Sequence, residues 1–274
     1  MNFWKSKLNS ITLYPKHIIP MGYKYKIDSG YFKEINTEYK AYILGFIFAD
    51  GSVYQPPGKN RQLVFRIGVQ EEDSYILDKL STDAAGNHKY TVRTPSSIAK
   101  GYKPQVLVTI SSNELCQDLI KLGCNIRKSK EGIIFPNLKP EMVRHFIRGF
   151  LDGDGSIILK KQTYSYKRKT SYFISNPHQD RYKLKLGFSS TDSEFLKKIA
   201  EMLNVSHYYI AEKQRTIMNY ILWIENKKDV EDSILYLYKD SQYFLKRKYE
   251  KVIEFNKIIK SQAEDASSEG LETT

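Results

Sequence analysis

The sequence has few cysteines and no long hydrophobic run, and each shortage argues against a class of protein. Two cysteines, Cys116 and Cys124, occur among 274 residues, which is too few for a disulfide framework and lacks the spacing of a zinc site. No apolar run approaches the roughly 18 residues that a membrane-spanning helix needs. The N-terminal segment has no apolar core or cleavage site of a secretory signal. We therefore expect an intracellular protein with reduced, buried thiols.

Acidic residues are also in short supply. Lys and Arg number 43 against 31 Asp and Glu, which gives a formal net charge of +12. A balance this basic indicates a polyanionic partner, nucleic acid first and an anionic membrane surface second. Charge alone leaves open a basic soluble protein without such a partner. The hydrophobic content of 41% is enough for a core, and the length suits one large domain or two ordinary ones.

The chain contains one pattern twice, at an offset of 104 residues. YILGFIFADGSV at 42–53 parallels FIRGFLDGDGSI at 146–157. Downstream, DSYILDKL (73–80) parallels DSEFLKKI (192–199), and each follows a strand-like run, at 63–69 and at 182–188. Second strand candidates lie at 105–110 and 220–225, and each half ends in an Arg-Lys pair. Four landmarks in the same order indicate two copies of one unit, helix–strand–strand–helix–strands–helix.

The strand-like runs alternate in polarity. In YKLKLGF (182–188), Leu184, Leu186 and Phe188 share one face, and Lys183 and Lys185 share the other. One face would pack on the core and the other would meet something negative. A sheet with one solvated face is the simpler alternative.

Each repeated segment places a carboxylate at the end of an expected helix. Small residues lie four apart, at Gly45 and Ala49 and again at 149 and 153, so two such helices could pack closely together. Asp50 and Asp154 would then lie side by side at two negative helix ends, where they repel unless a cation separates them. Oxygen-only ligation suits Mg²⁺. A plain Asp-Gly turn is the alternative for either segment alone.

Both segments resemble the LAGLIDADG motif of homing endonucleases, as ILGFIFADG (43–51) and IRGFLDGDG (147–155). The likeness covers roughly residues 32–258, and the stretch from 31 to 53 resembles bacterial and phage members. The resemblance implies an α+β fold of two pseudo-symmetric repeats, with the motif helices packed at the centre and an antiparallel β saddle for DNA. The repeats would span 32–135 and 136–260, after a basic arm at 1–31 and before a disordered acidic tail at 261–274.

The resemblance also implies a metal site. The final acid of each motif, Asp50 or Asp154, would bind divalent metal, and the backbone carbonyls of Ala49 and Gly153 would assist. Mg²⁺ is the expected ion, and Mn²⁺ or Ca²⁺ could substitute in binding. Phe48 departs from the motif, which usually has an acid there, as the second copy has at 152. That acid is generally structural, so its loss should not abolish cleavage.

Further site residues follow from the same resemblance. Family members place one lysine in each active site, for which Lys128 and Lys248 are the candidates; ordinary surface lysines are the alternative. Gln70 and Ser189 precede the 73–80 and 192–199 segments at comparable positions and are candidate water-pocket residues. Localisation would be cytoplasmic in a bacterial or phage setting and organellar in a eukaryote.

The predicted function is site-specific double-strand DNA cleavage by a monomer at a long recognition site. Strand side chains would read the major groove, which distinguishes all four base pairs. The segment 160–185 holds eight Lys or Arg against one acid and would be a strand pair and loop along the DNA, or a disordered basic loop. The candidate DNA contacts are Arg66, Arg93, Lys100, Lys103, Lys160, Lys161, Lys167, Arg168, Lys169, Arg181, Lys183 and Lys185.

Three other functions compete with this prediction. An intron RNA maturase or a non-catalytic DNA-binding regulator could share the fold, but both acids and both lysines are retained here. A DxD sugar-nucleotide enzyme would match DGDG at 152–155, yet it leaves the repeat and the basic charge unexplained. An intein host lacks support because splice-junction residues are missing.

Overall fold

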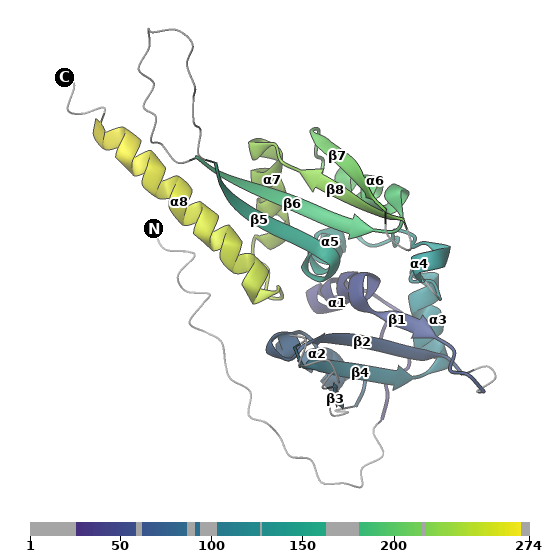
Figure 1. Cartoon of the computed structure of the whole chain (residues 1–274). Coiled ribbons are helices and arrows are strands. Elements are labelled where there is room, and N and C mark those ends of the chain that lie inside the picture. The colour runs from purple at the N-terminus through teal and green to yellow at the C-terminus, as the bar shows by residue number, and fades with distance from the viewer. Residues whose placement is uncertain are drawn as a thin grey trace.

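Two helices, one from each half of the chain, pack side by side at the centre of the molecule, with a four-stranded sheet on either side of the pair (Figure 1). The computed structural model describes residues 26–58, 62–86, 91–93, 103–126, 128–162, 181–214 and 218–269. Both sheets are antiparallel throughout. The α+β class and the two-repeat arrangement predicted from the sequence are confirmed.

The first half runs from a central helix through one sheet to two outer helices. Its elements are α1 (Glu38–Asp50), β1 (Ser52–Tyr54), β2 (Val64–Gln70), the 3-10 helix η1 (Glu71–Ile76), α2 (Asp78–Asp83), β3 (Thr91–Arg93), β4 (Gln105–Ser111), α3 (Asn113–Lys121) and α4 (Lys128–Glu131). The strand order is β1-β2-β4-β3. The sequence predicted one helix over 73–80; instead the chain forms η1 and then α2, with the change at Leu77.

The second half repeats this order. Its elements are α5 (Pro140–Asp154), β5 (Gly155–Gln162), β6 (Arg181–Ser190), α6 (Ser193–Met202), β7 (Tyr208–Lys213), β8 (Asn219–Ile224), α7 (Lys227–Tyr238) and α8 (Lys246–Glu269). The sheet order β5-β6-β8-β7 matches that of the first half. Helix α8 continues into the segment 261–274 that we expected to be disordered, because Ala and Glu favour helix and no glycine intervenes before Gly270.

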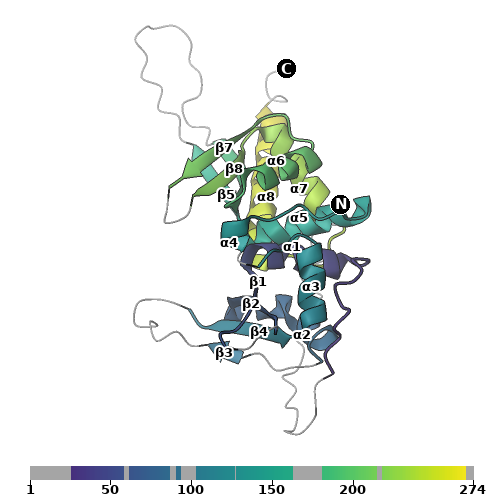
Figure 2. The same ribbon diagram turned by 90° about the vertical axis from the view of Figure 1, so that its right-hand side faces the viewer.

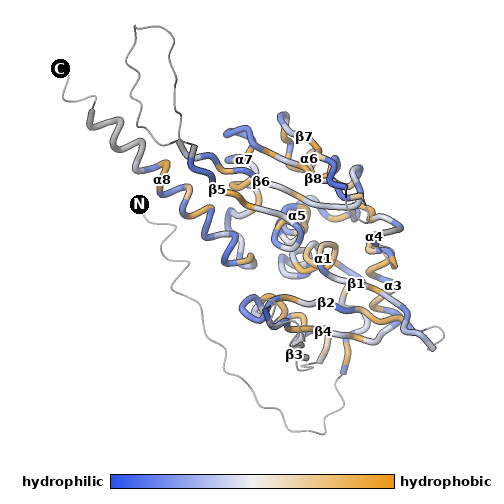
Figure 3. Tube along the Cα trace, in the orientation of Figure 1, coloured by the Kyte–Doolittle hydropathy of each residue, from blue (hydrophilic) through white to orange (hydrophobic). Residues whose placement is uncertain are grey.

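The strand alternation predicts the buried faces correctly. Phe65 and Ile67 of β2, and Leu186 and Phe188 of β6, are fully buried. The helices cover these faces, and the opposite faces of both sheets carry no helix among the described residues (Figure 2). Hydrophobic residues occur in the central helix pair and along the strands, and the coloured part of α8 carries both hydrophobic and hydrophilic residues (Figure 3). No described helix combines the length and apolarity that crossing a membrane requires.

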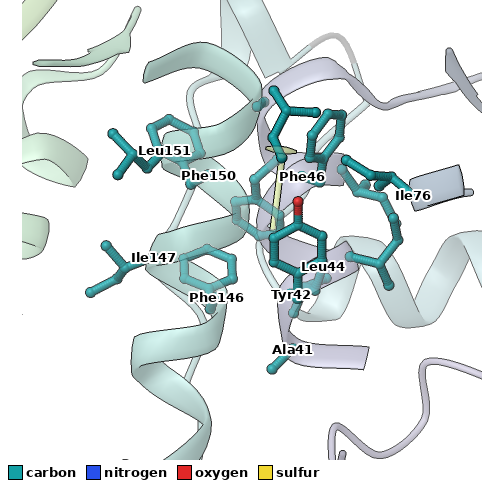
Figure 4. Packing of buried hydrophobic residues seen from close by; sticks show 14 of the residues in the cluster. Ala41, Tyr42, Leu44, Phe46, Ile76, Phe146, Ile147, Phe150 and Leu151 are labelled. Carbon is teal, nitrogen blue, oxygen red and sulfur yellow. The ribbon is translucent and has the colours of Figure 1, made fainter. Parts of the chain in front are cut away.

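Two glycines allow the central helices to touch backbone to backbone. A Cβ on Gly45 would collide with the carbonyl oxygen of Phe146, and a Cβ on Gly149 would collide with that of Tyr42. Aromatic rings from both helices fill the space around this contact (Figure 4). The small residues four apart therefore serve the close helix approach that the sequence predicted.

Candidate active site

Each central helix ends in an aspartate that is followed by glycine. Asp50 is the last residue of α1 and Asp154 the last of α5, and both residues are solvent-exposed. The following glycines, Gly51 and Gly155, have extended backbone with φ of −75° and −93°. Steric space explains both glycines, since a Cβ on either would collide with a carbonyl oxygen one turn earlier in its helix. The paired helices thus deliver two accessible carboxylates to one place.

A lysine caps the negative end of each helix. The Lys128 ammonium donates to the carbonyl oxygens of Ile47 (3.2 Å), Phe48 (2.6 Å) and Ala49. The Lys248 ammonium donates to those of Leu151 (2.7 Å), Asp152 (2.6 Å), Gly153 (3.3 Å) and Gly155 (2.7 Å). A cation at a helix C-terminus offsets its partial negative charge. The structure therefore places both predicted lysines beside the predicted acids, as helix caps rather than as solvated surface lysines.

The electrostatics at the helix ends favour an added cation. Reduced hydration, and next the charge of Asp154, raise the pKa of Asp50 to about 6, although Lys128 and Lys248 act in the opposite direction. Reduced hydration likewise raises the pKa of Asp154. Burial lowers the pKa of Lys248 to about 8 and also lowers that of Lys128. Two carboxylates that resist ionising together are stabilised as anions when a positive ion lies between them.

The donor set fits a hard divalent cation. Among the described residues, no three or more His, Cys, Asp and Glu side chains cluster as a metal site. The candidate ligands at the helix ends are the two carboxylates of Asp50 and Asp154. Ions such as Mg²⁺ accept few protein ligands and fill the remaining positions with water or phosphate oxygens. The predicted assisting carbonyls, of Ala49 and Gly153, accept hydrogen bonds from the capping lysines. Each carbonyl oxygen keeps a second lone pair.

The earlier motif positions differ between the two helices. Asp152 is fully buried and accepts from the Tyr42 hydroxyl (2.9 Å), the Tyr238 hydroxyl (3.3 Å) and the Leu245 amide (2.7 Å). Burial raises its pKa, and nearby Lys248 opposes that rise. These bonds give Asp152 a structural role. At the equivalent position, Phe48 packs among aromatic rings instead.

Ser189 lies near the end of α5. Gly155, the first residue of β5, pairs with Phe188 of β6. In the same antiparallel register, Ser189 lies opposite Asp154, the last residue of α5. Because Phe188 faces the core, Ser189 faces the open side of the sheet. Its hydroxyl accepts a hydrogen bond of 2.8 Å from Asn219. The position suits the predicted water-pocket role.

Gln70 does not occupy the equivalent position in the first half. Ser52 of β1 pairs with Arg66 of β2 in an antiparallel register. Two residues before Ser52 is Asp50, and the residue of β2 opposite it in this register is Gly68. Gln70 lies two residues further along the strand and pairs with Gln105. The sequence comparison matches Gln70 to Ser189 by their equal spacing to the helix expected next. The spacing to the α-helix that forms differs between the halves, because η1 follows β2 in the first half whereas α6 follows β6 in the second.

The open faces of the sheets carry several of the predicted DNA contacts. Arg66 lies over the Tyr54 ring at 5.2 Å, and Lys160 is exposed and pairs with Lys183. Lys161 shares a face with buried Ile157, so alternation directs it to the helix-covered side. Arg93 and Arg181 lie at strand ends, and Lys103 forms an exposed ion pair of 2.8 Å with Glu72. Lys100, Lys167, Arg168 and Lys169 lie outside the described residues, as does most of the predicted arm.

A cluster around Glu225 was missed in the sequence. Its carboxylate accepts from Lys183 (3.2 Å), Tyr209 (2.7 Å) and Lys185, whose ammonium lies 3.7 Å from the centre of the Trp223 ring. Period-two alternation in YILWIE (220–225) places Trp223 and Glu225 on one face, so the signal was present. What the sequence does not show is that β6 lies next to β8.

Comparisons with known proteins agree with this fold. Residues 147–259 match the family model described as LAGLIDADG endonuclease. The structure of I-SmaMI, a LAGLIDADG homing endonuclease bound to cleaved DNA, superposes with a TM-score of 0.54 at 14% identity, covering 87% of this chain and 94% of that chain. The LAGLIDADG meganuclease I-AabMI bound to uncleaved DNA gives 0.54 at 14% identity, covering 83% and 92%. No curated protein matches the sequence significantly.

The structure is a two-repeat fold with an aspartate at the end of each central helix. Its fold is similar to that of the meganucleases I-AabMI and I-SmaMI. The resemblance to the LAGLIDADG family seen in the sequence is confirmed by the family match over the second repeat, and the fold of both repeats is similar to that of LAGLIDADG meganucleases. The first repeat lies outside the matched range, and its motif is carried by the equivalent helix α1.

Proposed function

We propose that this chain is a site-specific, double-strand DNA endonuclease that acts as a monomer with Mg²⁺. The observation that carries the proposal is the pair of exposed carboxylates, Asp50 and Asp154, at the ends of two helices in backbone contact. Each acid has its own capping lysine within a pseudo-symmetric frame. Two equivalent half-sites match a substrate with two strands to cut.

Asp50 and Asp154 would hold the divalent ions. A bound divalent ion polarises a phosphodiester and lowers the pKa of bound water. The chain's own part is to hold the two carboxylates together at the ends of the paired helices. Lys128 and Lys248 secure the helix ends and keep positive charge where negative charge grows on the phosphate.

The sheets would bind and read the duplex. Their open faces present basic and polar side chains, and strand side chains fit the major groove. Phosphate contacts would position the DNA without reading it. Structures of I-SmaMI bound to cleaved DNA, and to uncleaved target in the presence of calcium ions, support this proposal by likeness of fold at 14% identity. A +12 net charge supports the polyanionic substrate.

Cleavage of a randomised plasmid library tests the proposal. With Mg²⁺, wild type should make double-strand cuts at one long site, and EDTA should abolish them. Asp50→Asn and Asp154→Asn should each slow the double-strand cut by more than about a hundredfold, because losing even a second-sphere group at a metal site typically costs 10–100-fold. Asp232→Asn, which removes the same charge from an exposed position on α7, should cut like wild type.

Binding measured on the same library separates the alternatives. A duplex that is bound in Ca²⁺ and never cut in Mg²⁺ would contradict the nuclease and favour a DNA-binding regulator. Tight binding of structured RNA with no duplex binding would favour the maturase. Equal cutting by wild type and by both Asp→Asn variants would disprove the two-acid site.

A further inference from the structure

The first repeat holds the segment that carries the second repeat's active-site lysine. Helix η1 of the first half contacts residues 244–247, which lead directly to Lys248 at the start of α8. The two groups are more than 160 residues apart in sequence. This contact is therefore a direct connection between one repeat and the catalytic machinery of the other.

An ion pair is the centre of this contact. The Arg247 guanidinium donates from Nε to the Asp73 carboxylate at 3.1 Å, and the Asp73 side chain is only 7% exposed. A hydrogen bond between a charged donor and a carboxylate is stronger than one between two neutral groups. Arg247 immediately precedes Lys248, so fixing its side chain restricts where the next residue can lie.

Tyr75 fixes the same segment from the same helix. Its hydroxyl accepts a hydrogen bond of 2.8 Å from the Lys246 amide and donates to the Phe244 carbonyl at 3.4 Å. The Lys246 ammonium lies 4.3 Å from the centre of its ring. Residues on both sides of Leu245 are thus tied to η1 before the chain reaches Lys248.

The first repeat's lysine stands in a similar relation to the second repeat. Asp192, the sequence counterpart of Asp73, caps the start of α6 and lies against Gly132, the residue that follows α4. Helix α4 begins at Lys128. Each half therefore contacts the lysine-bearing segment of the other.

We propose that Asp73 is a positioning residue which acts through Arg247 to place Lys248, so that the first repeat controls the cut made in the second repeat's half of the site. The proposal rests on the proposed nuclease function. A chain organised in this way would couple its two strand cuts through the interface between the repeats.

Strand-resolved cleavage tests the proposal on a target duplex first shown to be cut by wild type. Each strand is labelled separately, and Lys248→Met identifies the strand whose cut depends on that lysine. Asp73→Asn should slow the same strand by about tenfold, which is the size expected for one lost charge-assisted hydrogen bond. It should slow the other strand less than about twofold, so that duplex nicked in that strand accumulates.

A double-mutant cycle and a matched control complete the test. If Asp73 acts through Arg247, Asp73→Asn should add nothing in an Arg247→Gln background. Asp118→Asn breaks a similarly shielded pair, 3.2 Å from Lys121 in the same repeat, and should leave the strand ratio unchanged. Equal slowing of both strands by Asp73→Asn, slowing of the other strand, or no strand preference for Lys248→Met would each overturn the proposal. A wild type that cuts nothing would instead contradict the nuclease function.

Discussion

The two central helices share their contact surface and their final acids but differ at other positions, including the one two residues before the end. Gly45 and Gly149 lie at equivalent positions, and each faces the other helix's backbone. Asp50 and Asp154 are likewise equivalent. One difference lies at 48 and 152, where α1 has phenylalanine and α5 has aspartate.

In the second half, Asp152 belongs to a buried polar network. The Arg148 guanidinium, fully buried, donates to the Tyr243 and Leu237 carbonyls and to the Glu38 carboxylate, each at 2.7 Å. Asp152 accepts from the Leu245 amide in the same region. These bonds fix the connection between α7 and α8, which leads to Lys248.

In the first half, apolar packing replaces that network. Leu44 and Phe48 occupy the positions equivalent to 148 and 152, and both are buried. The Phe48 ring centre lies 5.1 Å from that of Phe146 and 6.2 Å from that of Phe195. The comparison teaches that symmetry is kept at the helix contact and the acids, whereas the supports differ because the two halves deliver their lysines by different connections.

The symmetric contact predicts the largest effect on stability. Gly45→Ala and Gly149→Ala should each destabilise the fold by about 3 kcal/mol or more, because the added methyl group meets backbone that cannot move aside without separating the helices. Urea unfolding at neutral pH measures the free energies. Since the two contacts are reciprocal, the two variants should lose similar amounts.

Gly30→Ala is the matched control for these variants. A Cβ there would meet only the Asp28 side chain, at an ordinary contact distance of 3.7 Å. Its free energy of unfolding should stay within about 0.5 kcal/mol of wild type. A loss below about 1 kcal/mol for Gly45→Ala would show that the central helices are not in close backbone contact.

The sequence predicted the repeated helices and strands, but it did not predict the side-chain contacts that depend on which elements are neighbours in the fold. Alternation predicted the buried faces of β2 and β6, and glycine spacing predicted the helix pair, because both signals are local. The position of Gln70 was misassigned because η1 shifts the spacing to the next helix. The Glu225 cluster and the contact between Asp73 and Arg247 join residues that only the tertiary fold brings together.

The polar network predicts an acid sensitivity that belongs to the second half. His145 is 5% exposed, and burial together with Arg148 and Arg144 lowers its pKa to about 3. Its Nδ1 lies 3.7 Å from Glu38, whose carboxylate is already engaged by Arg148. The equivalent residue of α1 is Ala41, which cannot titrate.

Because the pKa of His145 is lower in the folded than in the unfolded chain, the unfolded chain binds more protons below about pH 6.5. The contribution of neutral His145 to the free energy of unfolding is therefore complete above about pH 6.5 and decreases as the pH drops toward 3. Between pH 7 and pH 5 the loss should be about 1–2 kcal/mol. Unfolding of wild type and His145→Gln across this range isolates the contribution, since other groups cancel in the difference. Parallel curves for the two proteins would contradict the predicted pKa shift.

The smallest effect concerns the open faces of the two sheets. In the second half, Lys183 and Lys185 are both held by Glu225, and Lys185, the larger cause, helps to lower the pKa of that carboxyl to about 2. When the strand registers of the two repeats are matched, Val64 is equivalent to Lys185 and Ser111 is equivalent to Glu225. One half thus presents a neutralised charge cluster where the other presents none.

Glu225→Gln should strengthen non-specific DNA binding, because it frees two lysines on this face for phosphate contacts. Each added contact steepens the dependence of log Kd on log salt concentration by about 0.9, so we expect a change of about 1–2. Stability should change by about 1 kcal/mol, because these pairs lie at the surface with the Glu225 side chain 30% exposed. Glu194→Gln frees Lys197 on the helix-covered side with the same change in net charge, and its salt slope should equal that of wild type. Equal salt slopes for the Glu225→Gln and Glu194→Gln variants would mean that this face does not contact DNA. The duplex would then be bound by the sheet of the first half alone.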